Sequence, residues 1–203
     1  MIVYEVADGK YLPVSDAAEK VYLNITNRCN NDCAFCLRKL KTQGLWLERE
    51  PTLEEVKAEL EKLNWDAMRE VVVCGYGEPT CRQAELVEIL KYVKRHKVKT
   101  RLNTNGLGNL ENGRDISGEF AGILDEVSIS QNASSAEGYL RITRSKYGMA
   151  AYGAMLEFAD AMKKLSRVTL TVVDKVTSAA EIEKCRKTAE LHGVGFRVRA
   201  FEE

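Results

Sequence analysis

The sequence predicts an α/β fold in which a parallel sheet forms an open, partial (β/α)6 barrel after a short N-terminal β-hairpin. Strand-like apolar runs alternate with segments of helical periodicity about six times, as in parallel sheets with helices outside. About six units are fewer than the eight that close a barrel, so the sheet is expected to stay open. With 203 residues and no repeat or linker, residues 1–203 are expected to form a single domain, of which 1–19 are the hairpin extension.

The first elements are the hairpin and one strand. Asp8-Gly9 is a turn signal between residues 2–6 and 11–14, which are the expected arms of the hairpin. Residues 21–25 are rich in β-branched and aromatic side chains and predict a strand. This strand runs directly into a loop that contains cysteines.

The rest of the chain continues the alternation of helices and strands. Thr52 and Glu55 form a capping box, which begins a helix with apolar residues at helical spacing. These apolar residues are Leu53, Val56, Leu60 and Leu63. Further strands are expected at 71–73, 100–104, 126–130, 168–173 and 196–199. Further helices are expected at 82–96, 117–123, 135–142, 150–164 and from Ser178, the N-cap, to His192.

Composition and charge argue against several classes of protein. Lys and Arg total 30, as do Asp and Glu, so the broad basic surface of a nucleic-acid-binding protein is not expected. The N-terminus lacks the basic and apolar regions of a signal peptide. The chain has no run of about 18 apolar residues that could span a membrane. We therefore expect a cytoplasmic protein that binds neither membranes nor nucleic acids.

Three of the six cysteines, Cys29, Cys33 and Cys36, lie within one short segment. In a reducing compartment this spacing indicates metal or cluster binding rather than disulfides. Three thiolates on one loop can bind three irons of a four-iron cluster and leave the fourth iron without a cysteine. A structural zinc site is the alternative, and it needs a fourth ligand. The candidates for that ligand are His96, His192, Cys74 and Cys81.

A glycine-containing loop, Gly75-Tyr76-Gly77-Glu78-Pro79, follows the strand expected at 71–73. Glycine lets the backbone come close to a ligand or adopt a positive φ, and proline stiffens the exit from the loop. The loop therefore predicts either a segment that binds a ligand or an ordinary turn.

Polar residues end the next two expected strands. Asn105 follows 100–104, Ser130 ends 126–130, and Asn132 follows two residues later. The carboxyl ends of the strands in a barrel meet at one face, where ligand sites are built. Hydroxyl and amide groups at that face suit hydrogen bonds to a ligand, although the same residue types also form ordinary turns.

The C-x3-C-x2-C spacing, with Phe35 before the last cysteine, resembles the signature of the radical S-adenosylmethionine (radical SAM) superfamily. The resemblance implies an enzyme with that superfamily's partial barrel, in which Cys29, Cys33 and Cys36 bind a [4Fe–4S] cluster. S-adenosylmethionine would bind the fourth iron and be cleaved to methionine and a 5′-deoxyadenosyl radical, which abstracts hydrogen from a substrate. The electron would come from a donor such as flavodoxin or ferredoxin.

The resemblance also implies roles in binding S-adenosylmethionine for the aromatic residue and the glycine loop. Phe35 would lie against the adenine, unless it serves only to pack the core. Gly77-Glu78-Pro79 resembles the Gly-Gly-Glu-Pro segment of the family, which holds the ammonium group of the cofactor. Tyr76 stands where the family usually has glycine.

The polar strand ends resemble the residues that bind the ribose and the carboxylate in this superfamily. They are Asn105, Ser130 and Asn132, the last standing where the family has aspartate. An arginine near the position of Arg144 often pairs with the cofactor's carboxylate, although a solvated helix end would also explain it. Arg38, two residues after the last cysteine, is a further candidate to face the cluster or the substrate.

Within the superfamily, segments 23–33, 45–52 and 74–82 resemble the TatD-associated proteins most closely. The reaction of that group is not implied by the resemblance, so the substrate stays open. A glycyl-radical activating enzyme and a deazapurine-precursor synthase are the alternative enzymes, and a zinc-binding module is the alternative without catalysis. Because the chain ends soon after the sixth expected strand, we expect no auxiliary cluster and no added RNA-binding domain.

Overall fold

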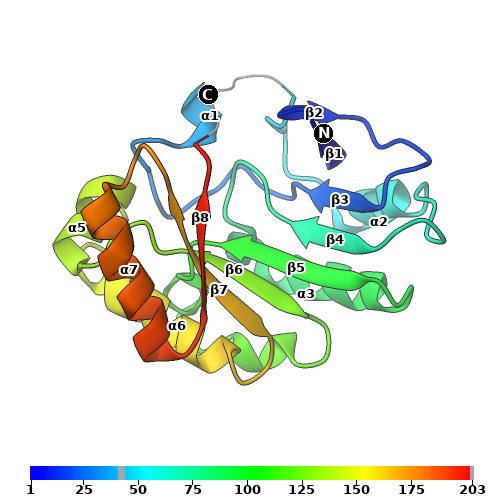
Figure 1. Ribbon diagram of the computed structural model, residues 1–203. Helices are drawn as coiled ribbons and strands as arrows, with labels where there is room; N and C mark the ends of the chain where they lie inside the picture. Colours follow the sequence, from blue (N-terminus) through cyan, green and yellow to red (C-terminus); the bar gives the residue numbers. More distant parts are fainter. Residues whose placement is uncertain (41–43, 202–203) are drawn as a thin grey trace.

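The computed structural model describes residues 1–40 and 44–201, in which eight strands form one sheet (Figure 1). In sheet order they are β2 (Lys10–Leu12), β1 (Val3–Ala7), β3 (Lys20–Leu23), β4 (Glu70–Val73), β5 (Lys99–Thr104), β6 (Glu126–Ser130), β7 (Arg167–Val173) and β8 (Gly195–Arg199). Strands β3 to β8 pair in parallel, and the sheet does not close between β2 and β8. The expected open barrel of six parallel strands is confirmed.

Most of the helices cover the outer face of the sheet, and α1 (Leu37–Leu40) lies at the carboxyl end of the strands (Figure 1). The others are α2 (Leu53–Leu60), α3 (Gln83–Lys94), α4 (Gly108–Asn112), α5 (Ala136–Thr143), α6 (Ala150–Met162) and α7 (Ala179–His192), with the 3-10 helices η1 (Pro79–Arg82) and η2 (Ser117–Phe120). In Figure 1, α2 and α3 lie behind β3 to β5, and α5 to α7 gather at the left, beside β6 to β8. Among the described residues, none of the helices has the length and apolar character needed to cross a membrane.

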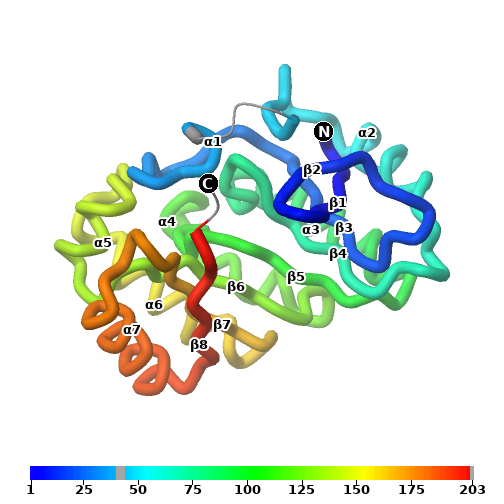
Figure 2. Tube along the Cα trace, turned by 45° about the horizontal axis from the view of Figure 1, so that its top comes forward, coloured from blue at the N-terminus to red at the C-terminus, as the bar shows by residue number. Residues whose placement is uncertain are grey.

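The N-terminal hairpin extends the sheet. Strand β1 is antiparallel to β2 and also to β3, with Val3 opposite Leu23. The expected arms at 2–6 and 11–14 are therefore confirmed with small shifts at their ends. The tube view shows the hairpin and β8 on the two sides of the open barrel (Figure 2).

The outer face of the sheet carries the hydrophobic core. Alternate residues of each central strand point outward, such as Val71 of β4, Leu102 of β5 and Ile129 of β6, and all three are buried. They pack against the apolar stripes of the helices, including Leu90 of α3 and Phe158 of α6. Burial of this apolar surface is the main source of stability.

The inner face of the same strands is polar. The residues that alternate with the outward ones line the hollow of the barrel. They include Tyr22, Arg101, Asn103, Ser130 and Arg197. A polar hollow surrounded by an apolar shell is suited to hold a ligand rather than to form a second core.

A row of alternating charges crosses the beginnings of five neighbouring strands. Lys20 of β3 lies 2.8 Å from Glu70 of β4, and Lys99 of β5 lies 2.9 Å from Glu126 of β6. Arg167 of β7 also contacts Glu126. This row forms the floor of the barrel, at the end opposite the cysteines.

Two short helices are not predicted by the sequence analysis. Helix α1 follows Cys36, and α4 follows Asn105-Gly106, which is typical of a turn. The helix expected at 82–96 begins earlier as η1, because Pro79 occupies its first turn and the Glu78 side chain caps it by accepting a hydrogen bond from Thr80 N. The capping box of Thr52 is confirmed.

Candidate active site

The cysteine segment lies between β3 and α1, at the carboxyl end of the parallel strands. The end of α5 holds it in place: Asp32 N donates to Thr143 O at 2.9 Å, and Ala34 N donates to Ile142 O at 3.0 Å. The last carbonyls of a helix have no partner within the helix, so they are free to accept these bonds. Helix α5 thus fixes the backbone between the cysteines.

A cavity of about 190 Å³, called here the cysteine cavity, brings eight of the twelve predicted site residues together. They are Cys29, Cys33, Phe35, Cys36, Tyr76, Asn105, Ser130 and Asn132. Of the remaining four, Gly77 lines a neighbouring cavity, and Glu78, Pro79 and Arg144 line neither cavity.

The three cysteines are free thiols and partly buried. Burial, followed by neighbouring negative groups, raises the pKa of Cys29 to about 11 and that of Cys33 to about 12. Among residues 1–40 and 44–201, no three His, Cys, Asp or Glu side chains converge on a single metal ion. A four-iron cluster binds each thiolate through a different iron and so has no need of such convergence.

Asn105 connects the third predicted strand to the cysteine segment. Its side-chain Nδ2 lies 2.5 Å from Asn30 Oδ1 and 4.0 Å from Cys29 Sγ. Its Oδ1 accepts a hydrogen bond from Leu107 N at 3.0 Å, which fixes the orientation of the amide. Tyr139 of α5 is buried beside it and bonds both Asn31 Nδ2 and Asn105 O. The amide of Asn105 is therefore held with its donor group toward Cys29.

Gly77 permits a close approach between the glycine loop and the cysteine segment. A Cβ atom at this position would collide with the carbonyl oxygens of Thr26 and Arg28. The neighbouring Glu78 N donates to Arg28 O at 2.7 Å, so the two backbones are in direct contact. The glycine thus serves the packing of two protein segments, which the sequence analysis did not foresee.

Glu78 is buried, and other parts of the chain use both oxygens of its carboxylate. Oε1 accepts from Thr80 N at 3.1 Å, Thr80 Oγ1 at 2.8 Å and Thr104 Oγ1 at 2.7 Å, and Oε2 accepts from Asn105 N at 2.8 Å. Burial raises its pKa, and these hydrogen bonds oppose the rise. The carboxylate thus joins η1 to the end of β5 rather than facing the cysteine cavity.

Asn132 presents a polar atom that has no protein partner. It is buried, adopts a positive φ of 55°, and its Oδ1 has no hydrogen-bond partner among the described residues. Buried polar atoms are normally satisfied, so an unpartnered oxygen in a residue that lines the cavity is unusual. Ser130 lines the same cavity from the end of β6.

Arg144 does not reach the cysteine cavity. It ends α5 with φ of 48°, and its half-exposed side chain lies 3.7 Å from the Asp32 carboxylate. Two other arginines, Arg38 and Arg199, line the cavity instead. Arg38 donates to the carbonyls of Asn27 and Asn31 at 3.4 and 3.3 Å. The period-two alternation of β8 was the available signal for Arg199, because it places Arg197 and Arg199 on the same face.

A second, larger cavity of about 520 Å³ fills the hollow of the barrel and is called here the barrel cavity. It lies between the two ends of the open sheet, since Tyr4 of β1, Tyr11 of β2 and Arg197 of β8 all line it. Six residues line both cavities, which places them side by side. They are Leu37, Gly75, Tyr76, Ser130, Arg199 and Ala200.

Comparison with known proteins places this chain in a family. The family model of the radical SAM superfamily matches residues 23–189. A GTP 3′,8-cyclase of Corynebacterium glutamicum (strain R) is 32% identical over 157 residues, covering 66% of this chain and 39% of the relative. A probable GTP 3′,8-cyclase of Methanocaldococcus jannaschii is 28% identical over 152 residues, covering 73% of this chain and 46% of the relative. The chain thus spans less than half the length of these relatives.

Solved structures share the fold at low sequence identity. Streptococcus suis SuiB bound to S-adenosylmethionine has a TM-score of 0.71 at 16% identity, covering 91% of this chain and 41% of that one. TYW1 with a lysine–pyruvate adduct bound has a TM-score of 0.66 at 16% identity, covering 91% of this chain and 65% of that one. Because the family model covers most of the sequence, this chain belongs to the radical SAM superfamily, whose enzymes use a [4Fe–4S] cluster and S-adenosylmethionine.

Proposed function

We propose that this chain binds a [4Fe–4S] cluster through Cys29, Cys33 and Cys36 and binds S-adenosylmethionine beside it in the cysteine cavity. The observation that carries this proposal is that the three cysteines line one cavity together with Phe35, Asn105, Ser130 and Asn132. Thiolates suit iron, and an amide oxygen suits a hydroxyl donor such as those of a ribose. When bound, the two cofactors supply a one-electron cleavage that yields a hydrogen-abstracting radical.

The side chains around the cavity support the binding of S-adenosylmethionine. Phe35 offers an apolar ring for the adenine, and Ser130 and Asn132 offer hydrogen bonds to the ribose. Tyr76 separates the cysteine cavity from the barrel cavity and lines both. Arg38, which lines the cysteine cavity, is better placed than Arg144 to pair with the cofactor's carboxylate.

The main role of the glycine loop is to position the cysteine segment and Asn105. Gly77 allows the contact with the cysteine segment, Pro79 begins η1, and Glu78 anchors the backbone of Asn105. Asn105 in turn directs its Nδ2 toward Cys29. Hydrogen bonds to the sulfur ligands of a cluster tune its reduction potential. We therefore assign Glu78 and Asn105 to the support of the cluster.

The resemblance to the TatD-associated group stays a proposal, as does an electron donor such as flavodoxin or ferredoxin. The segments that carry this resemblance contact one another: Asn27 Nδ2 donates to Leu47 O at 2.7 Å, and Glu50 lies 2.8 Å from Arg28 and 3.8 Å from Arg82. Segment 45–52 thus fastens the base of the cysteine segment. These contacts explain why the three segments form one unit.

A second candidate is a reaction on a purine nucleotide, because several relatives are named GTP 3′,8-cyclase. Incubating the reconstituted enzyme with GTP and S-adenosylmethionine tests it. GTP-dependent formation of a new nucleotide product would support it, and unchanged GTP would exclude it. The glycyl-radical activating and deazapurine-precursor alternatives are not favoured by these relatives.

The proposed function is tested by anaerobic reconstitution with iron and sulfide. We expect broad absorbance near ~400 nm and release of 5′-deoxyadenosine when dithionite and S-adenosylmethionine are added. Replacement of Cys29, Cys33 or Cys36 by alanine should reduce both signals to background. The matched control is Cys81→Ala, which lies outside both cavities. Loss of the cluster in Cys81→Ala or Cys74→Ala would instead indicate a four-cysteine site, and the proposal would be withdrawn.

A further inference from the structure

The barrel cavity has a strongly positive wall. Strands β5 and β8 are not neighbours in the sheet, yet the curvature of the barrel brings Arg101, Arg197 and Arg199 to the same cavity. None of the described residues that line this cavity is an aspartate or glutamate. Three guanidinium groups without a carboxylate among them create a positive potential inside a hollow, where the field is screened less than at the surface.

The carboxylates at the floor of the barrel neutralise these arginines only in part. Glu70 lies 3.7 Å from Arg101, but it also lies 2.8 Å from Lys20 and 3.7 Å from Lys99. Glu126 is shared between Lys99 and Arg167. The floor therefore has more cations than carboxylates, and positive charge remains for the cavity above it.

The described protein partners do not satisfy every donor of these arginines. The Nε of Arg101 is buried and has no partner among the described residues, and the side chain is only 13% exposed. Arg197 donates to Ser128 Oγ at 3.2 Å. Burial, followed by the charges of Arg101 and Arg199, lowers the pKa of Arg197, although Glu126 and Glu70 oppose the shift. Protein partners thus satisfy these guanidinium groups only in part, and an anion in the cavity would add charge-assisted hydrogen bonds to them.

We infer that the barrel cavity binds the substrate through an oxyanion group, a phosphate or a carboxylate, held by Arg101, Arg197 and Arg199. This inference rests on the proposed function, because it names the substrate class for the same site. The volume of about 520 Å³ fits a small molecule. Arg199 lines both cavities, so an anion bound by the three arginines lies within reach of the S-adenosylmethionine site.

Direct binding to the reconstituted protein tests the inference. Isothermal titration calorimetry is carried out with three probes that share a phenyl ring: phenyl phosphate, phenylacetate and the neutral benzyl alcohol. We expect one or both anions to bind and benzyl alcohol to give no measurable heat; the two anions distinguish phosphate from carboxylate. The double variant Arg101→Gln with Arg197→Gln should weaken the binding of the preferred anion at least about tenfold, because it loses charge-assisted hydrogen bonds.

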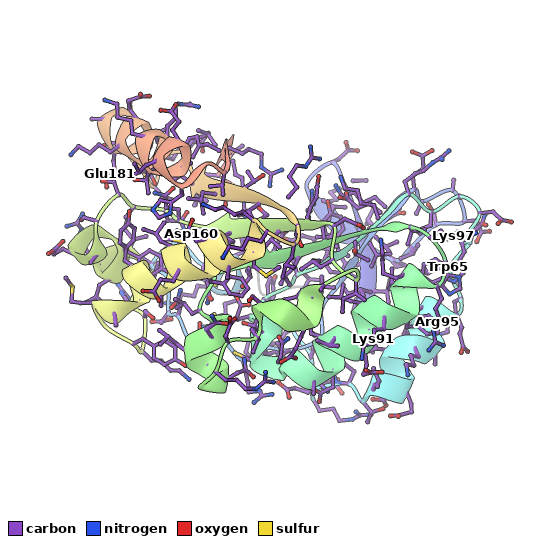
Figure 3. The ribbon with its side chains drawn as sticks, turned by 90° about the horizontal axis from the view of Figure 1, so that it is seen from below. Trp65, Lys91, Arg95, Lys97, Asp160 and Glu181 are labelled. Atoms are coloured by element: carbon purple, nitrogen blue, oxygen red, sulfur yellow. The ribbon has the colours of Figure 1, made fainter. Side chains whose placement is uncertain are left out.

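The matched control is Arg95→Gln, at the C-cap of α3, where Figure 3 shows it beside the helices; it does not line the barrel cavity. It should change the affinity less than about twofold. If the double variant fails to fold, labelling of wild-type arginines by phenylglyoxal replaces it, and the preferred anion should slow the labelling of Arg197 but not of Arg95. Equal binding of all three probes, or anion binding that the double variant keeps, would overturn the inference and favour a neutral or protein substrate. Formation of 5′-deoxyadenosine by the wild type, measured separately, tests the proposed function without reference to any anion.

Discussion

The two faces of the sheet show how one set of strands serves both stability and binding. In β5, Thr100 and Leu102 point outward and are buried against helices, whereas Arg101 and Asn103 point into the barrel cavity. The outer face is satisfied by the protein alone. The inner face leaves the Nε of Arg101 and the Oδ1 of Asn103 without partners among the described residues.

The unpartnered polar atoms indicate that the inner face is less favourable for stability than the outer face, as expected for a face that binds a ligand. Burial of apolar side chains on the outer face is favourable without further partners. A buried polar atom without a hydrogen bond is unfavourable by about 1–3 kcal/mol, so such atoms persist only where something compensates them. Substitutions of neighbouring residues on opposite faces should therefore affect different properties.

The largest effect is expected from Leu102→Ala on the outer face. Leu102 is fully buried in the main core, so its truncation leaves a cavity and should lower the free energy of unfolding by about 2–5 kcal/mol. The matched variant Asn103→Ala, one residue along the same strand, removes an unpartnered oxygen and a hydrogen bond to Cys74, and should cost about 1 kcal/mol. Urea denaturation of both variants measures the difference. Equal losses would mean that the inner face also holds the fold together, and the contrast between the faces would be wrong.

An intermediate effect is expected from Gly77→Ala, where the glycine loop meets the cysteine segment. The new methyl group would collide with the carbonyls of Thr26 and Arg28 and should destabilise the protein by about 1–3 kcal/mol. Because the displaced backbone leads to Cys29, the fraction of protein that takes up a cluster should also fall. Gly118→Ala is the control, since a Cβ there meets no atom within 4 Å. Normal cluster content in Gly77→Ala would show that the glycine loop is not needed for cluster binding.

The fold could be predicted from the sequence because its signals are local. The strand at 126–130 and the capping box at Thr52 each depend on residues close together in the chain, and both are confirmed. The three cysteines and Phe35 also lie in one segment, which is why they could be recognised together. These features need no knowledge of which strands become neighbours.

Other features depend on distant contacts that no local pattern contains. Arg101 and Arg197 share a cavity only because the barrel curves, and the sequence analysis named neither. Arg144 was chosen from its position in the chain, but the left-handed end of α5 lets its side chain pair with Asp32. Glu78 was read as a ligand of the cofactor, and its hydrogen bonds to Thr104 and Asn105 could be known only from the fold.

The smallest effect is expected from Glu126→Gln at the floor of the barrel. This variant tests whether ion pairs stabilise the inner face of the sheet as apolar packing stabilises the outer face. Burial acts to raise the pKa of Glu126, but the hydrogen bonds from Lys99 and Arg167 outweigh it and keep the pKa below its ordinary value of 4.5. Removing the charge of this largely buried carboxylate should lower the stability at neutral pH by about 1 kcal/mol.

The dependence on pH follows from the direction of that shift. A carboxylate whose pKa is lowered by folding stabilises the folded state above the unfolded value of 4.5 and loses this contribution as the pH falls through the folded pKa. The gap in stability between wild type and Glu126→Gln should therefore be constant above about pH 5.5 and should close in more acidic solution. Urea denaturation across this range measures it, with Glu59→Gln as the control, because the Glu59–Lys62 pair is exposed and contributes little. If the difference in stability did not change as the pH fell, Glu126 would stabilise the protein by its packing and not by its charge. The floor would then be stabilised by packing, as the outer face is.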